Sequence, residues 1–332
     1  MVPPNSRTSA GTVDASQHSG VDAAASRSAE SLASNVLIPP RLVGALTRYE
    51  LTAPRRDGSL GGSHRSPRHG SSQDFADYRE YRPGDDHRRI DQRVLARLDQ
   101  VLIRLHDAEE SARVRLIVDN SASMGFDDKA FRAAQVAGVV GQVALQTRDL
   151  VEVVAAPGAV RHEAIGGGRA GIPALHRRLL ATARTSSPDG SVAETVSLLQ
   201  RGGNKTAITV LFSDLAEPTW ELALEGLLGA KQQNVLVHVV APFELDPTKY
   251  PHPELGEILT GDVTLVDIET RSTVEVSATS KVLKQYRDTF VAWCDTVAQA
   301  CARRGIRYVR VRTDEDLEQL ALGPLRAAAG YR

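Results

Sequence analysis

Short runs of apolar, mostly β-branched residues alternate along this chain with segments in which apolar residues recur every three or four positions. A continuous short run is typical of a strand buried on both faces of a sheet, whereas the wider spacing is typical of an amphipathic helix. The predicted core strands lie at 114–118, 151–155, 208–212 and 235–240. The predicted helices among them lie at 131–144, 172–184, 192–201 and 222–232. This alternation favours an α/β fold with a mostly parallel central sheet and helices on both faces.

The pattern changes toward the C-terminus. Two alternating segments, 263–267 and 273–276, flank a short polar stretch and predict a β-hairpin. Apolar residues then recur every three or four positions from Val282 to Cys301, which predicts a long helix that lays one stripe on the sheet. A last strand at 308–311 and a short helix complete the predicted fold.

The N-terminal third differs in character from the rest. Residues 1–36 are rich in Ser, Ala, Gly and Thr and are predicted to form a disordered tail, because they hold few large apolar groups to bury. Residues 37–110 form a predicted N-terminal segment with a basic, Gly- and Ser-rich loop at 55–72. Within this segment, residues 74–97 carry many charges of both signs, which favours an ion-pair network or a docking surface. Residues 111–332 hold the predicted α/β domain.

Composition narrows the possible partners and the compartment. Lys and Arg number 40 against 41 Asp and Glu, for a net charge of -1, so no global attraction to nucleic acid or to an acidic membrane is expected. No apolar run approaches the ~20 residues needed to cross a bilayer, and no leader pattern is present. Cys294 and Cys301 lie about 10 Å apart along one predicted helix, too far for a disulfide, so free buried thiols are expected. We therefore expect a cytoplasmic protein without a membrane span.

Candidate chemistry gathers where two of the predicted strands end. Asp119, Ser121 and Ser123 follow the strand at 114–118 in a D-x-S-x-S spacing, which turns three oxygen atoms toward one point. Asp214 follows the strand at 208–212. Ligands bind outside the carboxyl ends of strands in open α/β sheets, so the two acids are expected to share one crevice. Oxygen ligands at a small site suit Mg²⁺ (or Mn²⁺), which wants octahedral oxygen coordination.

Other interpretations of these residues have to be weighed. Asp and Ser are common turn formers and helix caps, which would give the turn a purely structural role. A carboxylate with Mg²⁺ also serves phosphoryl transfer, but such enzymes usually have a second nearby acid and position 121 is Ser. A serine hydrolase lacks its Gly-x-Ser-x-Gly elbow here. The Arg55–His69 loop could contact nucleic acid, but no aromatic platform accompanies it.

Two motifs resemble those of known families, and they follow one another along the chain in the order expected from the resemblance. Asp119-x-Ser121-x-Ser123, with Asp214 after a later strand, resembles the metal-ion-dependent adhesion site (MIDAS) of von Willebrand factor type A-like domains. Upstream, the chain more closely resembles bacterial proteins of the domain-of-unknown-function family 58, in the run Tyr78-Arg79-Glu80-Tyr81-x-Pro83-Gly84-Asp85-Asp86-x-Arg88-x-Ile90-Asp91 followed by Ala96-Arg97. The family usually has Trp after the last Asp of that run, whereas this chain has Gln92.

The resemblance implies a von Willebrand factor A-like, Rossmann-type domain and a third loop in the site. The family pattern has a Thr between the two acidic strands. Ser191, after Gly190, is the best match, with Thr195 and Ser187 as alternatives. The implied metal ligands are Asp119, Ser121, Ser123, Ser191 and Asp214.

The resemblance also implies a function and a partner. The ion would keep an open position for a carboxylate from a partner protein, so the expected protein is a non-catalytic binding module and not an enzyme. Such proteins tend to accompany MoxR-type AAA+ ATPases in complex assembly, maturation or stress response.

Overall fold

The computed structural model describes residues 36–51, 75–81, 90–98, 100–106, 112–158, 164–187, 190–201, 207–228, 232–268 and 272–331. The chain divides into two compact units, residues 55–111 and the remainder, and each is described by itself. The predicted tail (apart from Val36) and the Arg55–His69 loop lie outside the described residues.

The large unit is built on a six-stranded sheet with the strand order β10-β7-β6-β3-β4-β5. Its strands are β3 (Arg113–Asp119), β4 (Leu150–Ala156), β5 (Ala164–Ile165), β6 (Ile208–Ser213), β7 (Gln233–Val240) and β10 (Arg307–Arg312). All neighbouring strands are parallel except β5, which runs antiparallel to β4 at the edge. The predicted mostly parallel α/β sheet is therefore confirmed.

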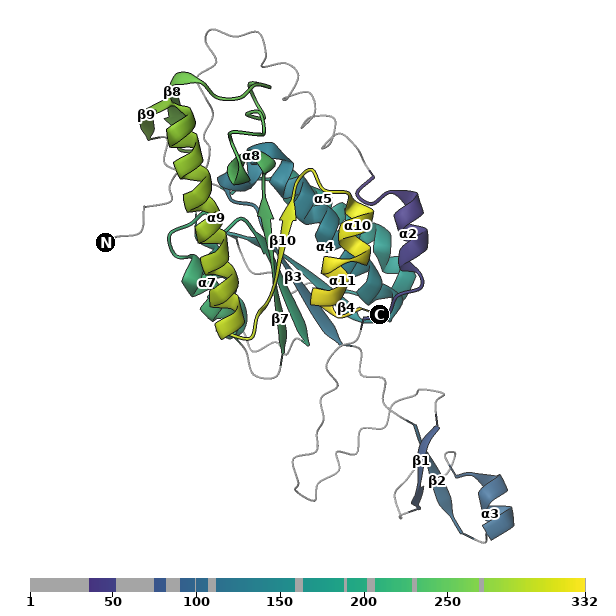
Figure 1. The fold of residues 1–332 in the computed structure, drawn as a ribbon. Coiled ribbons are helices and arrows are strands. Elements are labelled where there is room, and N and C mark those ends of the chain that lie inside the picture. Colours follow the sequence, from purple (N-terminus) through teal and green to yellow (C-terminus); the bar gives the residue numbers. More distant parts are fainter. Residues whose placement is uncertain are drawn as a thin grey trace. The chain divides into compact units, whose positions relative to one another are not determined.

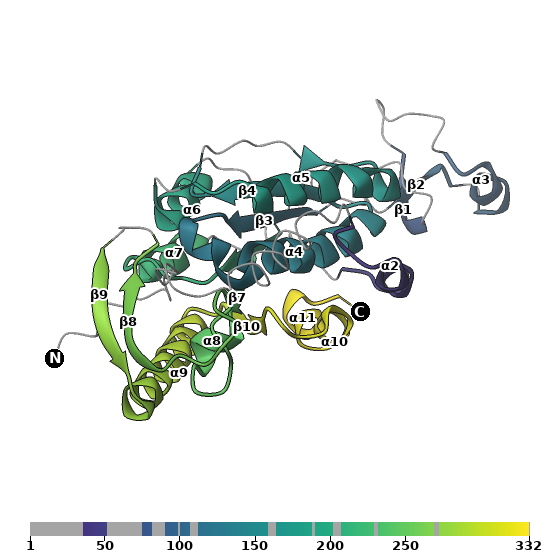
Figure 2. The ribbon, with the colours of Figure 1, turned by 90° about the horizontal axis from the view of Figure 1, so that it is seen from above.

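Helices cover both faces of this sheet (Figures 1 and 2). One face packs against α2 (Pro40–Leu46), α4 (Lys129–Gln146), α5 (Ile172–Arg184), α10 (Leu317–Leu322) and α11 (Pro324–Ala329). The other face packs against α6 (Val192–Arg201), α7 (Trp220–Leu227) and α9 (Ser280–Arg303). Short elements complete the unit: the 3₁₀ helices η2 (Ala122–Asp128) and η3 (Gly168–Gly171), α8 (Pro242–Leu245), and the hairpin of β8 (Gly261–Val266) and β9 (Thr273–Ala278).

Side-chain alternation along β3 decides where the candidate site lies. Leu116 and Val118 pack into the α4 and α5 face, whereas Ile117 packs into the α6 and α7 face. Successive side chains of a strand point to opposite faces, so Asp119, two residues after Ile117, lies at the carboxyl end of the strand on the α6 and α7 face.

The N-terminal boundary of the large unit differs from the prediction. Leu37, Ile38, Leu42 and Leu46 are buried in the main core, and Leu51 forms a bridge with Tyr331. The segment that contains α2 therefore belongs to the large unit, because its apolar residues complete the core beside α4. In the small unit, the charged 74–97 segment contributes β1 (Phe75–Glu80), which pairs antiparallel with β2 (Leu102–His106), and most of α3 (Gln92–Leu98).

The predicted stripe of α9 on the sheet holds only for the C-terminal half of the helix. The buried residues of α9 are Cys294, Val297, Ala300 and Cys301, whereas Val282 is 38% exposed. The helix has 24 residues and spans about 36 Å, while the six residues of β10 span about 20 Å. The first half of α9 therefore extends past the sheet and packs beside α8 and β9.

Two further expectations from composition can be compared with the structure. Both cysteines are buried and free, as the spacing predicts. Among the described residues, no helix is long and apolar enough to span a bilayer.

Candidate functional site

Loops from three parts of the chain meet around a small polar cavity of about 40 Å³ at the carboxyl end of the sheet. The turn after β3 contributes Asp119 and Ser121, and the turn after β6 contributes Asp214 and Glu217. The connection between α5 and α6 contributes Ser187 and Gly190. Because β3 and β6 are adjacent parallel strands, their terminal acids lie at one edge, as predicted.

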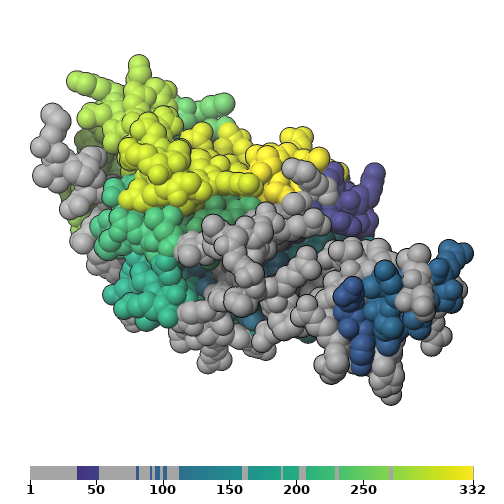
Figure 3. Space-filling view, turned by 90° about the horizontal axis from the view of Figure 1, so that it is seen from below, coloured from purple at the N-terminus to yellow at the C-terminus, as the bar shows by residue number. Residues whose placement is uncertain are grey.

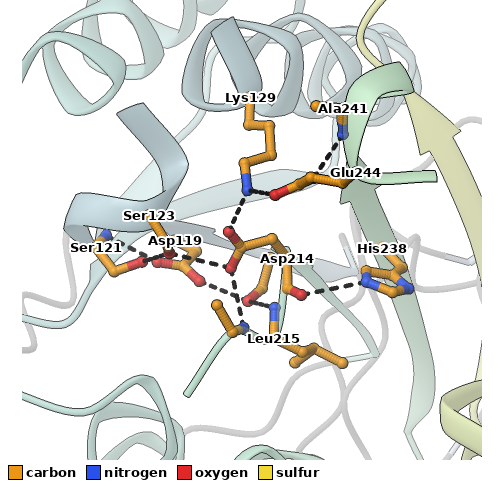
Figure 4. Close-up of polar contacts among 11 residues, drawn as sticks. Asp119, Ser121, Ser123, Lys129, Asp214, Leu215, His238, Ala241 and Glu244 are labelled. Atoms are coloured by element: carbon orange, nitrogen blue, oxygen red, sulfur yellow. Dashed lines mark hydrogen bonds and ion pairs between the residues drawn. The ribbon is translucent and has the colours of Figure 1, made fainter. Parts of the chain in front are cut away.

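Asp119 is buried, and each of its two oxygens accepts a hydrogen bond (Figure 4). Its Oδ1 accepts from the backbone N–H of Ser121 at 2.8 Å, and its Oδ2 accepts from the hydroxyl of Ser213 at 2.5 Å. Burial, reinforced by the nearby charge of Asp214, raises the pKa of Asp119 to about 7. A cation placed beside this carboxyl group would favour its charged form.

The two turn hydroxyls connect Asp119 to Asp214. The hydroxyl oxygens of Ser121 and Ser123 lie 3.0 Å apart, and Ser123 donates to Oδ1 of Asp214 at 3.3 Å. That same oxygen accepts from the N–H of Ala216 at 3.1 Å. Four of the predicted site residues thus form one continuous network.

A lysine that the sequence analysis did not single out holds the other oxygen of Asp214. The fully buried ammonium of Lys129 lies 2.7 Å from Oδ2 of Asp214 and 2.7 Å from Oε1 of Glu244. Burial acts to raise the pKa of Asp214, but the charge of Lys129 overrides it and keeps that pKa below its usual value. Asp214 itself lines the cavity, and its Oδ1 is also the acceptor that orients the hydroxyl of Ser123.

Glu244 ties this charge cluster to the next strand. It follows β7 by four residues, in α8, and its Oε2 accepts from the backbone N–H of Ala241 at 2.7 Å. Burial acts to lower the pKa of Lys129, but Asp214 and Glu244 together raise it, so the ammonium stays charged. One buried lysine therefore links the ends of β6 and β7.

His238 supports Asp214 from β7. Its Nε2 lies 3.2 Å from the backbone carbonyl of Asp214, and its Nδ1 lies 2.9 Å from the hydroxyl of Tyr308. A carbonyl can only accept, so Nε2 carries the proton and Nδ1 accepts from Tyr308. Burial lowers the pKa of His238 to about 4, which keeps the ring neutral.

The buried neutral His238 predicts a loss of stability in acid. As the pH falls from 6.5 toward 4, His238 binds a proton in the unfolded chain but stays neutral in the folded protein. The free energy of unfolding therefore decreases. Between pH 7 and pH 5, protonation of His238 in the unfolded chain should lower the free energy of unfolding by about 2 kcal/mol. Denaturant unfolding at both pH values measures it, and the His238→Gln variant should lack this share of the loss. An equal pH dependence in the variant would contradict the assignment.

The third loop offers three hydroxyls, and they have different surroundings. The Ser191 hydroxyl accepts from the N–H of Glu194 at 3.3 Å and so caps α6. Thr195 donates to the backbone carbonyl of Ser191 at 3.2 Å. Of the three, only Ser187 lines the cavity, next to Gly190. A ligand role for Ser191 would therefore require its hydroxyl to leave the helix cap.

Glu217 is a second acid that sequence reasoning missed. Its carboxylate lines the cavity and accepts from the N–H groups of Val192 at 3.2 Å and Ala193 at 2.9 Å, the first residues of α6. Glu217 therefore holds the loop before α6 against the loop after β6. No spacing motif marks it, because its position depends on how two loops meet.

The oxygen atoms around the cavity could bind a hard cation, but carboxylates would supply only some of the ligands. Within the described ranges, no three His, Cys, Asp or Glu side chains are grouped so that they could hold a metal ion. An ion in the cavity would therefore rely on Asp119, on serine hydroxyls and on water. Mg²⁺ accepts such a set, because it commonly retains several waters beside one or two carboxylates.

The fold and the site define a mixed α/β protein with a cavity, lined by carboxylates and hydroxyls, at the carboxyl end of a mostly parallel sheet. The chain belongs to the family described as "Protein of unknown function DUF58", whose model matches residues 77–296. The family resemblance predicted from the run at Tyr78–Arg97 is thereby confirmed.

Mycobacterial proteins and one solved structure are similar to this chain. The chain is 28% identical over 301 residues to the uncharacterized proteins Mb1516 of Mycobacterium bovis and Rv1480 of Mycobacterium tuberculosis, with 83% of this chain and 86% of each relative covered. A crystal structure of the conserved hypothetical protein BatB from Bacteroides thetaiotaomicron matches 66% of this chain and 99% of that chain, with a TM-score of 0.35 and 13% identity.

Proposed function

We propose that this protein is a non-catalytic, metal-dependent protein-interaction module of the von Willebrand factor A-like type. The observation that carries the proposal is the continuous network of Asp119, Ser121, Ser123 and Asp214 beside the polar cavity. The spacing of these residues along the chain matches the MIDAS pattern, and adjacent parallel strands bring its two halves together.

The chain's own groups have distinct roles in this proposal. Asp119 and the hydroxyls of Ser121 and Ser123 bind Mg²⁺ (or Mn²⁺), while Asp214 orients Ser123. When bound, the ion supplies a Lewis-acidic position for one carboxylate of a partner protein. The connection between α5 and α6 contributes one further oxygen ligand, which is the hydroxyl of Ser187 or Ser191 or a water bound to one of them.

The proposed partner is a MoxR-type AAA+ ATPase, because proteins that this chain resembles tend to accompany such ATPases. Partner exchange at the metal, without chemistry on a substrate, is the functional event in this account.

Metal removal provides the experiment. Capture of a MoxR-type ATPase from the same organism by the immobilised full chain should be lost in excess EDTA and restored by adding Mg²⁺ back in excess over the chelator. Restoration is the necessary control, because it separates loss of the ion from irreversible unfolding. Capture that persists unchanged in EDTA would contradict a metal-dependent interface.

A further inference from the structure

A second cleft, of about 510 Å³, lies at the other end of the strands from Asp119. Gln233 and Arg307, the first residues of the parallel strands β7 and β10, line it together with residues of the α10 to α11 segment. In the space-filling view the C-terminal helices reach the surface in yellow, close to the purple segment that contains α2 (Figure 3). The cleft is therefore separate from the proposed metal site.

The described residues give the cleft charge of one sign. Its charged lining residues are Arg307 and Arg326, and no Asp or Glu of the described ranges lines it. Within the described part of the chain, neither guanidinium lies within ion-pair distance of a carboxylate. The remaining described lining residues are uncharged: Gln233, Leu322, Gly323, Ala327, Gly330 and Tyr331.

Both arginines are held in place by contacts that leave donors available. Arg307 uses Nη1 to donate to the backbone carbonyl of Ala328 at 3.0 Å, and the guanidinium carbon of Arg326 lies 5.1 Å from the ring centre of Tyr49. A guanidinium has five N–H donors, so one hydrogen bond or one ring contact does not exhaust it.

A glycine keeps space beside Arg307. Gly330 has φ of 76°, and a Cβ at this position would lie 3.2 Å from Nη1 of Arg307. A larger residue would therefore press on the guanidinium as well as strain the backbone.

We propose that this cleft binds a small organic anion through a phosphate or carboxylate group held by Arg307 and Arg326. Guanidinium groups match both oxyanions with paired hydrogen bonds. The volume lies within the range of small-molecule sites, about 300–1,000 Å³, and the apolar walls can contact the rest of such a molecule.

Ligand-dependent thermal stability tests this proposal. The full chain is first freed of divalent ions on a chelating resin, so that chelation cannot contribute and no soluble polycarboxylate competes for the cleft. It is then melted with inorganic pyrophosphate, with citrate, or with sodium chloride at equal ionic strength. We expect pyrophosphate, citrate or both to raise the melting temperature by a few degrees beyond the chloride control, since a ligand that binds only the folded state stabilises it. A response to one probe alone identifies the group that the cleft prefers.

Variants decide whether the response comes from the cleft. Arg307→Gln and Arg326→Gln should each abolish the shift, whereas Arg177→Gln, an exposed change on α5, should keep it. If Arg307→Gln impairs folding through the lost contact with Ala328, Arg326→Gln still provides the test. No shift in the wild type, or an equal shift in Arg326→Gln, would overturn the proposal. Asp119→Ala should respond as the wild type does, which separates this site from the proposed metal site.

Discussion

Replacing Lys129 by Met should lower the free energy of unfolding by about 3–5 kcal/mol. The ammonium is fully buried and lies 2.7 Å from both Asp214 and Glu244, so its removal leaves two buried carboxylates without their cation. Removing one partner of a buried ion pair costs far more than the pair itself contributes, because the remaining charge has lost its solvent as well as its partner.

Matched variants separate this effect from a general loss of charge. Arg304→Met removes the Arg304–Glu225 pair, in which Glu225 is 55% exposed, and should cost at most about 1 kcal/mol. Adding Asp214→Asn and Glu244→Gln to Lys129→Met should recover a large part of the lost stability, because no buried charge then remains unpaired. Denaturant unfolding measures all three proteins. A cost for Lys129→Met as small as that for Arg304→Met would show that the buried cluster is not charged as described.

Replacing Asp119 by Ala should abolish metal-dependent capture of the partner without unfolding the protein. Asp119 is the only carboxylate of the network whose oxygens are not shared with the ammonium of Lys129. Loss of an outer-shell partner of a metal ligand costs about 10–100-fold in metal affinity, and loss of the ligand itself should cost at least as much. Capture in the presence of Mg²⁺, measured beside far-ultraviolet circular dichroism, tests both halves of the expectation.

Asp119→Asn provides the matched variant. The amide oxygen keeps an acceptor for the N–H of Ser121, and the NH2 group that replaces the other oxygen can donate to the Ser213 hydroxyl, which now donates to Asp119. The charge is lost without opening a cavity, so the variant should fold like the wild type and still fail to capture the partner. Undiminished capture by either variant would contradict a role for Asp119 in binding the ion.

The apolar runs were sufficient to predict a mostly parallel sheet and to place the two acids at its carboxyl edge. Residues 114–118 and 208–212 are buried on both faces, and parallel strands end at the same edge, but only the structure shows that β3 and β6 are neighbours. The hydroxyls of Ser121 and Ser123 could be placed because they follow Asp119 within one turn.

Side chains whose role depends on contact between separate loops could not be predicted. Lys129 begins α4, and Glu244 lies after β7, so nothing in their spacing reveals that one ammonium bridges Glu244 and Asp214. Glu217 likewise acquires its role only when its loop meets the start of α6. The choice of a third hydroxyl is of this kind too, because capping of α6 by Ser191 competes with any ligand role.

Titration of the full chain with Mn²⁺ tests the central claim most directly. Calorimetry, with electron paramagnetic resonance of free Mn²⁺ as a second readout, should show one saturable site that excess Mg²⁺ displaces, and the Asp119→Asn variant should bind at least about tenfold more weakly. Absence of saturable binding up to millimolar Mn²⁺, or equal affinity in Asp119→Asn, would contradict a cation site formed by Asp119 and its neighbouring serines.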